Sequence, residues 1–201
     1  GRLCGDGTVG GGGHAEAILE ASGPDGRLVG FDRDDWALAA AARRLKRFGG
    51  RLELHREPFA GLAKRLAKAS CDGVLLDLGV SSPQLDEAER GFSFMQDGPL
   101  DMRMDTTRGQ TAEQWIAETK EEDMVWAFKA FGEERYAKRI ARAIIEKRQK
   151  ASINRTLQLA EIIKEAHPRW EKHKHPATRC FQAIRIAVNS ELDDLQKTLE
   201  Q

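Results

Sequence analysis

The chain has 201 residues, of which 40% are hydrophobic and 32% are charged. This composition is typical of a folded globular protein and excludes an intrinsically disordered one. Lys plus Arg and Asp plus Glu both number 32, so the total charge gives no indication of a nucleic-acid partner. Any such prediction depends on local clusters of charge.

Cysteine usage and hydropathy exclude several further classes of protein. Cys4, Cys71 and Cys180 are far apart and form no CxxC pair, so they predict neither a disulfide framework nor a metal site. A reducing, cytoplasmic location fits them. No apolar run approaches the roughly 18 to 20 residues that span a bilayer, so we expect no membrane segment. The helical pattern runs to the last residue without a stop signal, which indicates a fragment or a trimmed chain.

Strand-like and helical stretches alternate over the first hundred residues. The strands are expected over 3–4, 27–31, 52–55 and 73–76, and the helices over 15–21, 34–48 and 62–69. This alternation is typical of βαβ units that form a parallel sheet. The fourth run is continuously apolar, which predicts a parallel strand buried on both faces.

Three of these strands are followed by a carboxylate, namely Asp6, Asp32 and Asp77. Ligands of open α/β sheets bind beyond the carboxyl ends of the strands, so we expect the three side chains to meet in one crevice. Asp32 is placed to accept hydrogen bonds from ribose hydroxyls, and Asp34 to cap the next helix. Phe59 follows the third strand. Its side chain is equally suited to contact the adenine of a ligand or to pack in the hydrophobic core.

A glycine-rich turn, DGTVGGGGH at residues 6–14, follows the first strand and opens the first helix. Its glycines let the backbone approach a ligand closely, and both a dinucleotide and S-adenosylmethionine remain open as ligands. The spacing fits GxGxxG only loosely. The acid-first form favours the methyl donor, which has a positively charged sulfonium and no phosphate. The strand and helix on either side argue against a flexible linker.

The segment DLGVSSPQ, residues 77–84, begins where the fourth strand meets this crevice. Methyl transfer to an exocyclic amine needs the nitrogen lone pair aimed at the sulfonium carbon, and acceptors that bond the amine hydrogens achieve this. Asp77, Ser81 and Ser82 are therefore the candidate catalytic residues. A turn in which Ser81 or Ser82 caps a helix is an equal alternative.

The rest of the chain carries charged loops and helices. A lid, a substrate loop and a solvated connection all remain open for the segment 86–105. From Thr111 onward the pattern predicts helices only. The apolar positions between Phe181 and Leu199 predict one last helix that returns to the sheet domain.

Cations cluster between residues 135 and 150, and again between 164 and 179. These clusters are equally consistent with binding to a nucleic-acid phosphate backbone and with an ordinary solvated helix face. His167, His173 and His175 have no carboxylate or thiol at ligand spacing, so we predict no metal site.

Several long stretches match one family and are far more specific than a glycine fingerprint. They are DGT at 6–8, GGH at 12–14, DRD at 32–34, DLGVSSPQLD at 77–86, ERGFSF at 89–94, DGPLDMRMD at 97–105, GEE at 132–134, RIARAI at 139–144 and FQAIRIAVNSEL at 181–192. With them the chain resembles, over nearly its whole length, the bacterial ribosomal RNA small-subunit methyltransferase H family, also called MraW.

The resemblance implies an α/β fold, a Rossmann-like S-adenosylmethionine methyltransferase sheet with an inserted all-helical domain. The corresponding division is residues 1–105 for the first part of the methyltransferase domain, 106–175 for the insertion and 176–201 for the returning helix. It also implies N4-methylation of a cytosine near the decoding centre of 16S ribosomal RNA, with that RNA or the small subunit as partner. The implied contacts with S-adenosylmethionine are Gly12, Gly13, His14, Asp32, Phe59, Asp77 and Gln84.

Two other hypotheses are carried forward. An RNA-binding ribosome-assembly protein with a vestigial cofactor fold would explain the cationic helices without catalysis. A nicotinamide-dependent oxidoreductase would rest on the glycine turn and Asp32 alone. The family extends at both ends, including a downstream Ser-Phe-His-Ser-Leu-Glu-Asp segment, so we expect an incomplete sheet in this chain. The oligomeric state is not indicated.

Overall fold

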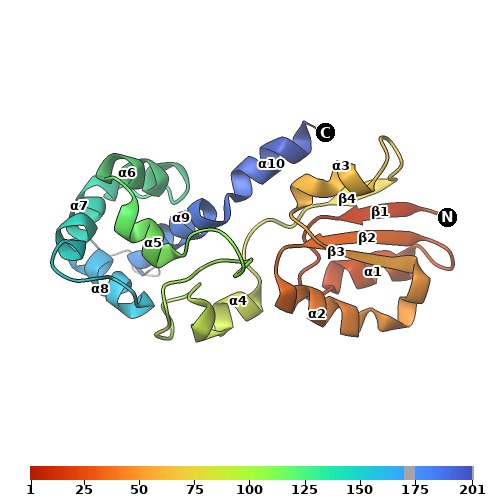
Figure 1. The fold of residues 1–201 in the computed structure, drawn as a ribbon, viewed down its shortest axis with the longest axis horizontal. Helices are drawn as coiled ribbons and strands as arrows, with labels where there is room; N and C mark the ends of the chain where they lie inside the picture. The colour runs from red at the N-terminus through yellow and green to blue at the C-terminus, as the bar shows by residue number, and fades with distance from the viewer. Residues whose placement is uncertain (170–174, 201) are drawn as a thin grey trace. The chain divides into compact units, whose positions relative to one another are not determined.

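A computed structural model describes residues 1–169 and 175–200 of the chain. The chain divides into two compact units (Figure 1). The sheet unit comprises Gly1–Gly79 and Glu191–Gln201, and the helical unit comprises Val80–Ser190. Lys172, His173 and Lys174, which belong to the second predicted cation and histidine cluster, lie outside the described residues.

The sheet unit contains a four-stranded parallel sheet in the order β3-β2-β1-β4. Its strands are β1 (Leu3–Asp6), β2 (Arg27–Asp32), β3 (Leu52–Arg56) and β4 (Gly73–Leu75). The α-helices are α1 (Gly13–Ala21), α2 (Asp35–Arg44), α3 (Leu62–Arg65) and α10 (Glu191–Leu199), with 3-10 turns η1 (Lys46–Arg51) and η2 (Phe59–Gly61). This strand order is that of a doubly wound Rossmann-like sheet, so the predicted α/β fold class is confirmed.

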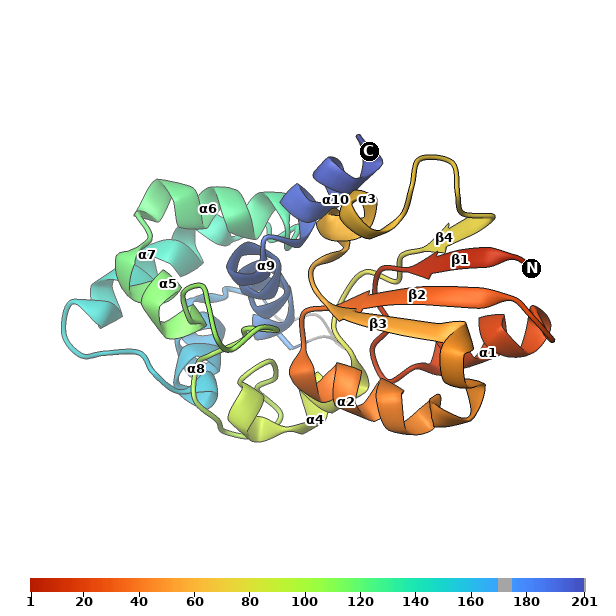
Figure 2. The ribbon, with the colours of Figure 1, turned by 45° about the vertical axis from the view of Figure 1, so that its right-hand side comes forward.

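Helices cover both faces of the sheet, with α1 and α2 on one side and α3 and α10 on the other (Figures 1 and 2). Alternate residues of β2 point to opposite faces. Leu28 packs with Leu19 and Leu45 in the α1–α2 layer. Phe31 packs with Phe59 in the layer that contains α3, and both side chains are buried. The ends of β1 and β2 are therefore supported from two sides.

The fourth strand is parallel as predicted, but it is not buried. Val74 is 54% exposed, and in the described part of the chain β4 pairs with β1 alone. An apolar hollow of about 790 Å³ lies beside it, with Leu66, Val74 and Leu199 among its lining residues. The prediction of burial was wrong for this strand because an edge strand lacks the second neighbour that its apolar residues are suited to meet.

The helical unit is built from helices around one core. They are α4 (Ser82–Asp86), α5 (Ala112–Glu118), α6 (Glu121–Ala130), α7 (Ala137–Arg148), α8 (Thr156–Ala166) and α9 (Ala177–Asn189), with the 3-10 turn η3 (Ala88–Arg90). Fully buried Phe128, Ile140 and Phe181 bring α6, α7 and α9 into this core. The prediction of helices from Thr111 onward is confirmed in the described residues.

The predicted last helix is two helices, because the chain breaks at Ser190, where φ is 51° in the left-handed region. Helix α9 belongs to the helical unit and α10 to the sheet unit. Both ends of the Asn189 amide are engaged: Nδ2 donates to the Met102 carbonyl oxygen and Oδ1 accepts from the Met104 amide, each at 2.8 Å. These bonds tie the end of α9 to the preceding loop rather than to a continuing helix.

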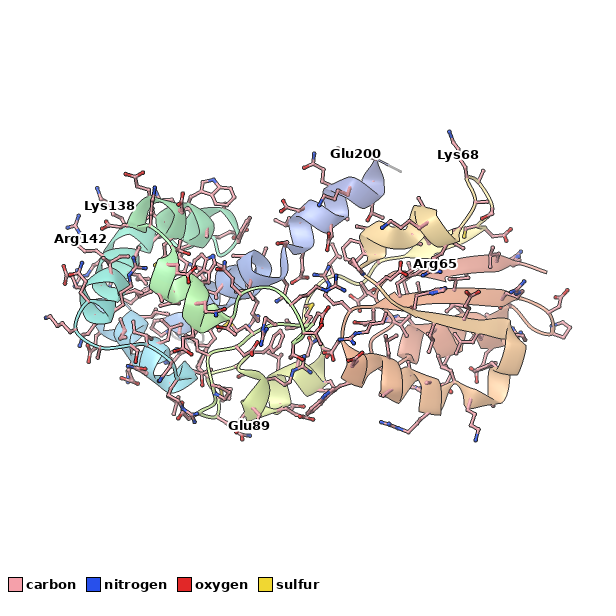
Figure 3. All side chains as sticks on the ribbon, viewed as in Figure 1. Arg65, Lys68, Glu89, Lys138, Arg142 and Glu200 are labelled. Carbon is pink, nitrogen blue, oxygen red and sulfur yellow. The ribbon has the colours of Figure 1, made fainter. Side chains whose placement is uncertain are left out.

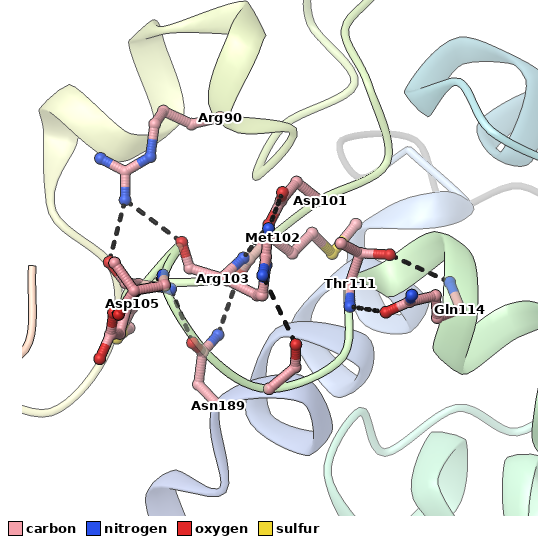
Figure 4. A network of polar contacts seen from close by, with 11 residues as sticks. Arg90, Asp101, Met102, Arg103, Asp105, Thr111, Gln114 and Asn189 are labelled. Carbon is pink, nitrogen blue, oxygen red and sulfur yellow. Dashed lines mark hydrogen bonds and ion pairs between the residues drawn. The ribbon is translucent and has the colours of Figure 1, made fainter.

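Residues 86–105 form neither a simple solvated connection nor a detached loop (Figure 4). Leu100 and Met102 are buried in the core of the helical unit. Arg103 forms two side-chain bonds of 2.8 Å with Asp101, and Arg90 donates to the Arg103 carbonyl oxygen at 3.3 Å. The unit division after Gly79 therefore differs from the predicted boundary at residue 105, because this segment packs with the helices.

Replacement of Gly91 with alanine should destabilise the helical unit by about 2–5 kcal/mol. Gly91 has φ +68°, and an added Cβ would overlap the carbonyl oxygen of Pro99. Gly109→Ala is the matched control, since φ is +76° there and no atom lies within 4 Å of the added Cβ. The control should cost only about 1–2 kcal/mol in denaturant unfolding. An equal loss of unfolding free energy in the two variants would contradict the predicted overlap at Gly91.

Candidate functional site

The glycine-rich turn after β1 is fixed by bonds to both neighbouring strands. The Gly7 amide donates to the Leu75 carbonyl oxygen at the end of β4 (2.9 Å), and the Val9 amide donates to Phe31 in β2 (3.1 Å). The Thr8 hydroxyl accepts from the Asp77 amide at 2.7 Å. The turn therefore bridges the carboxyl ends of three parallel strands, where ligands of such sheets bind.

Asp6, Asp32 and Asp77 come together around this turn, as the spacing of the strands predicted. The Asp6 carboxylate accepts from the Thr8 amide (3.0 Å), and Asp32 accepts from the Gly10 amide (2.9 Å). Asp77 follows β4 and lies 3.5 Å from the Nε2 atom of His14. One short turn thus contacts a carboxylate from the end of each of three strands.

The Asp6 carboxyl group is the most buried of the three carboxylates. Its side chain has no solvent exposure, and its Oδ2 atom has no hydrogen-bond partner among the described residues. Burial raises its pKa, the Thr8 amide and His14 act in the opposite direction, and the charges of Asp32 and Asp77 raise it further. A buried oxygen without a partner is suited to a ligand that brings a hydrogen-bond donor or a positive charge.

Asp32 is held in one orientation by its own backbone surroundings. Its Oδ1 atom accepts from the Asp34 amide at 2.9 Å, while Gly10 binds Oδ2. Burial raises the pKa of Asp32, and these amide bonds oppose the shift. Asp34 accepts from the Trp36 amide as the N-cap of α2, so the predicted capping role is confirmed. The Asp32 oxygens are therefore positioned without help from a flexible partner.

Glycine is required at position 12, where the turn becomes α1. Gly12 is the N-cap residue of the helix and has φ +85°. A Cβ atom there would lie 3.2 to 3.3 Å from atoms of Leu45 and Ala41, so a side chain would be crowded as well as strained. Gly13 begins α1, and His14 follows in its first turn with a largely exposed side chain. Gly13 and His14 are thus exposed, with His14 beside Asp77, whereas Gly12 is buried where the turn meets α1.

The remaining predicted site residues lie in the hydrophobic core or in the first turn of a helix. Phe59 is 5% exposed and packs with Phe31 in the core, which is the alternative that the sequence left open. Ser81 is the N-cap residue of α4, and Gln84 completes a capping box by accepting from the Ser81 amide at 3.0 Å. Ser82 begins that helix. Ser81, Ser82 and Gln84 belong to the helical unit, and their roles toward substrate or cofactor stay predictions.

Thr8 is the residue of this site that the sequence reasoning missed. Its hydroxyl holds the Asp77 backbone, and its amide holds the Asp6 carboxylate. Asp6 was expected in the crevice but was not included among the cofactor contacts. The only signal for Thr8 was a small hydroxyl residue directly after the acid-glycine pair, and that signal does not say which strand the hydroxyl would bind.

The arrangement favours a nucleoside with a positive charge over a pyrophosphate. Three carboxylates around one turn repel phosphate, whereas they attract a cation and accept bonds from ribose hydroxyls. Within the described ranges no cluster of three metal-ligating side chains occurs. No described helix is long and apolar enough to cross a membrane.

A parallel sheet in the order β3-β2-β1-β4, with a glycine-rich turn and three carboxylates at its carboxyl edge, defines a Rossmann-like α/β protein. The model of the MraW methylase family matches residues 2–201, and the chain belongs to that family. It is 56% identical over 207 aligned positions to a protein of Thioalkalivibrio sulfidiphilus (strain HL-EbGR7) named ribosomal RNA small subunit methyltransferase H. That match covers 98% of this chain, which spans 63% of the length of the relative.

A solved structure of a candidate rRNA-methylase from Clostridium thermocellum also matches part of the chain. The two are 24% identical, with a TM-score of 0.35, over 40% of this chain and 47% of that one. The strand order and the crevice described above do not depend on this partial match.

Asp6→Asn should stabilise the ligand-free protein at pH 7. The raised pKa means that the buried carboxyl group favours its neutral form, so ionisation costs stability as the pH rises above its ordinary value of 3.8. The asparagine side chain does not ionise, so it avoids this loss of stability, and its Oδ1 atom still accepts from the Thr8 amide. The difference in unfolding free energy should shrink as the pH falls toward 3.8, with exposed Asp35→Asn as control. A wild-type protein more stable than the variant at pH 7 would contradict this.

Proposed function

We propose that this chain is an S-adenosylmethionine-dependent methyltransferase that modifies the N4 atom of a cytosine in 16S ribosomal RNA. The observation that carries the proposal is the cluster of three carboxylates around the glycine turn, in which the buried Oδ2 atom of Asp6 has no hydrogen-bond partner among the described residues. Membership of the MraW methylase family and the name of the curated relative support the reaction and the RNA. The position near the decoding centre rests on the resemblance of the motifs.

The residues present fit S-adenosylmethionine. When bound, this cofactor supplies a methyl group made electrophilic by a positively charged sulfonium. Asp32 is suited to accept hydrogen bonds from ribose hydroxyls, because its carboxylate is already oriented at the end of β2. Gly12 and Gly13 are proposed to contact the cofactor through their backbone, while the missing side chain of Gly12 accommodates Leu45 and Ala41 of the protein itself. Asp77 would supply negative charge for the cationic ligand, and the Oδ2 atom of Asp6 would supply a buried polar partner.

Asp77 is the proposed acceptor for the exocyclic amine of the target base. Its backbone is fixed by Thr8, while its carboxylate is exposed and near His14. A carboxylate that accepts an amine hydrogen holds the nitrogen and turns its lone pair toward the methyl group. Ser81 and Ser82 are proposed to add acceptors on the substrate side.

The proposed partner is 16S ribosomal RNA, alone or within the small subunit, and the proposed location is the cytoplasm. The alternative of a ribosome-assembly protein with a vestigial cofactor fold predicts RNA binding without cofactor binding. The nicotinamide-dependent alternative predicts binding of NAD, which the three carboxylates disfavour. Titration with the two ligands separates these functions.

Methyl transfer from labelled S-adenosylmethionine to undermethylated small subunits should be detectable with the wild-type protein. Asp77→Ala should lower the rate about 100-fold or more, because the amine loses its acceptor. Asp72→Ala makes the same charge change directly before β4, where among the described residues the carboxylate accepts only from the Leu3 amide, and should retain most of the activity. Mass spectrometry of the RNA then locates the methyl group. Label in the small subunits at an atom other than cytosine N4 would contradict the proposed product.

Asp32→Ala should weaken S-adenosylmethionine binding about 10- to 100-fold, as expected when charged hydrogen bonds to ribose are lost. Isothermal titration calorimetry measures this directly and independently of RNA. Asp35→Ala removes a nearby exposed carboxylate that pairs with Arg56 and should leave the affinity nearly unchanged. Equal affinity for Asp32→Ala and wild-type protein would remove Asp32 from the cofactor site.

A further inference from the structure

The first half of α7 and the turn before it carry an unusual local excess of positive charge. Residues 135–150 contain seven Lys or Arg residues and one Glu. Helix α7 is amphipathic, with Ile140 and Ile144 buried and Lys138, Arg139 and Arg142 exposed. The last three lie at positions i, i+1 and i+4, so they share one side of the helix. Their charge is therefore directed away from the core.

These cations are not all neutralised by neighbouring carboxylates. Arg148 donates to the carbonyl oxygens of Ile116 and Thr119, which gives it a structural role. Arg142 lies 3.9 Å from Glu121 at the start of α6. In the described parts of the chain, Lys138 and Arg139 have no ion-pair partner. The uncompensated charge therefore lies toward the beginning of α7.

Helix α6 contributes an exposed aromatic ring and another cation. The Trp126 side chain is 60% exposed, although its ring packs edge-on against Phe131 with a centroid distance of 4.9 Å. Lys129 lies one turn further along on the same side and is exposed. The indole is thus supported on one edge while much of its surface remains open to a ligand.

The end of α6 and the start of α7 are joined by a short connection, and the two helices pack together. Figure 3 shows Lys138 and Arg142 along the outer side of α7. We call this region the α6–α7 corner and define it by five exposed residues: Trp126, Lys129, Arg135, Lys138 and Arg139. Exposed Glu122 and Asp123 lie one turn before Trp126 on α6, and exposed Glu133 lies in the connection, so the cations at the Arg135–Arg139 end carry the positive charge of the corner.

We propose that the α6–α7 corner docks a single-stranded segment of the substrate RNA, with phosphates on its cations and one base stacked on Trp126. Cations alone would suit any polyanion, but an exposed ring one helical turn from Lys129 matches the way proteins bind single-stranded RNA. An acidic protein segment would bind the cations but would offer no planar base to stack on the indole of Trp126. The identity of the RNA rests on the proposed function, whereas the docking chemistry rests on the surface.

The test measures binding of full-length 16S ribosomal RNA transcript at several salt concentrations. Lys129→Gln/Lys138→Gln/Arg139→Gln should raise Kd at least about tenfold and reduce the slope of log K against log salt by about 2, since each lost phosphate contact removes about 0.7. Lys46→Gln/Lys64→Gln/Lys68→Gln removes three exposed cations of the sheet unit and serves as control. The control should change both quantities much less.

Trp126→Ala should raise Kd about 5- to 100-fold without changing the salt slope, and Trp126→Phe should restore part of the affinity. Circular dichroism and the Kd for S-adenosylmethionine should be unchanged in every corner variant, which separates docking from folding and cofactor binding. An RNA affinity that the corner variants leave unchanged, or that the control triple lowers equally, would overturn the inference.

The two proposals fail separately. Methyl transfer by the wild-type protein together with unaltered RNA binding by the corner variants would retain the function and remove this docking surface. Corner-dependent RNA binding without methyl transfer would retain the surface and remove the proposed reaction. No RNA binding by the wild-type protein would overturn both.

Discussion

The glycine-rich turn at the end of β1 is the constraint on which the candidate site depends. Gly7, Thr8 and Val9 bond to residues after β4 and within β2, so a single turn sets the relative positions of three strand ends. Parallel strands place their carboxyl ends on one edge, but only these bonds bring the acidic side chains around one small volume. The pairing of β1 with β2 places Asp6 near Asp32, and the bond from the Asp77 amide to Thr8 brings Asp77 to them.

This arrangement is unfavourable for the empty protein and favourable for a cationic ligand. Burial and mutual repulsion raise the pKa of Asp6, and burial raises that of Asp32. Binding sites commonly contain such groups because a ligand relieves the strain that the fold tolerates. The backbone amides of Thr8 and Gly10 oppose these pKa shifts and so reduce the cost of ionising the two carboxyl groups.

The helical unit shows how a loop between elements becomes part of a core. Leu100 and Met102 lie within the hydrophobic cluster, and Asn189 bonds the loop backbone at the end of α9. Because these residues satisfy buried backbone groups, the loop is ordered and the last helix cannot continue through Ser190. At the other end of this unit, α7 exposes cations that its packing does not need.

The sequence alone determined the α/β class, the four parallel strands, the helices after Thr111 and the carboxylates that meet at the sheet edge, because these follow from local periodicity and strand polarity. Only the tertiary structure decided the exposure of β4, the break at Ser190, the core position of Phe59 and the role of Thr8. Each of these depends on contacts between residues distant in sequence, which no local pattern encodes.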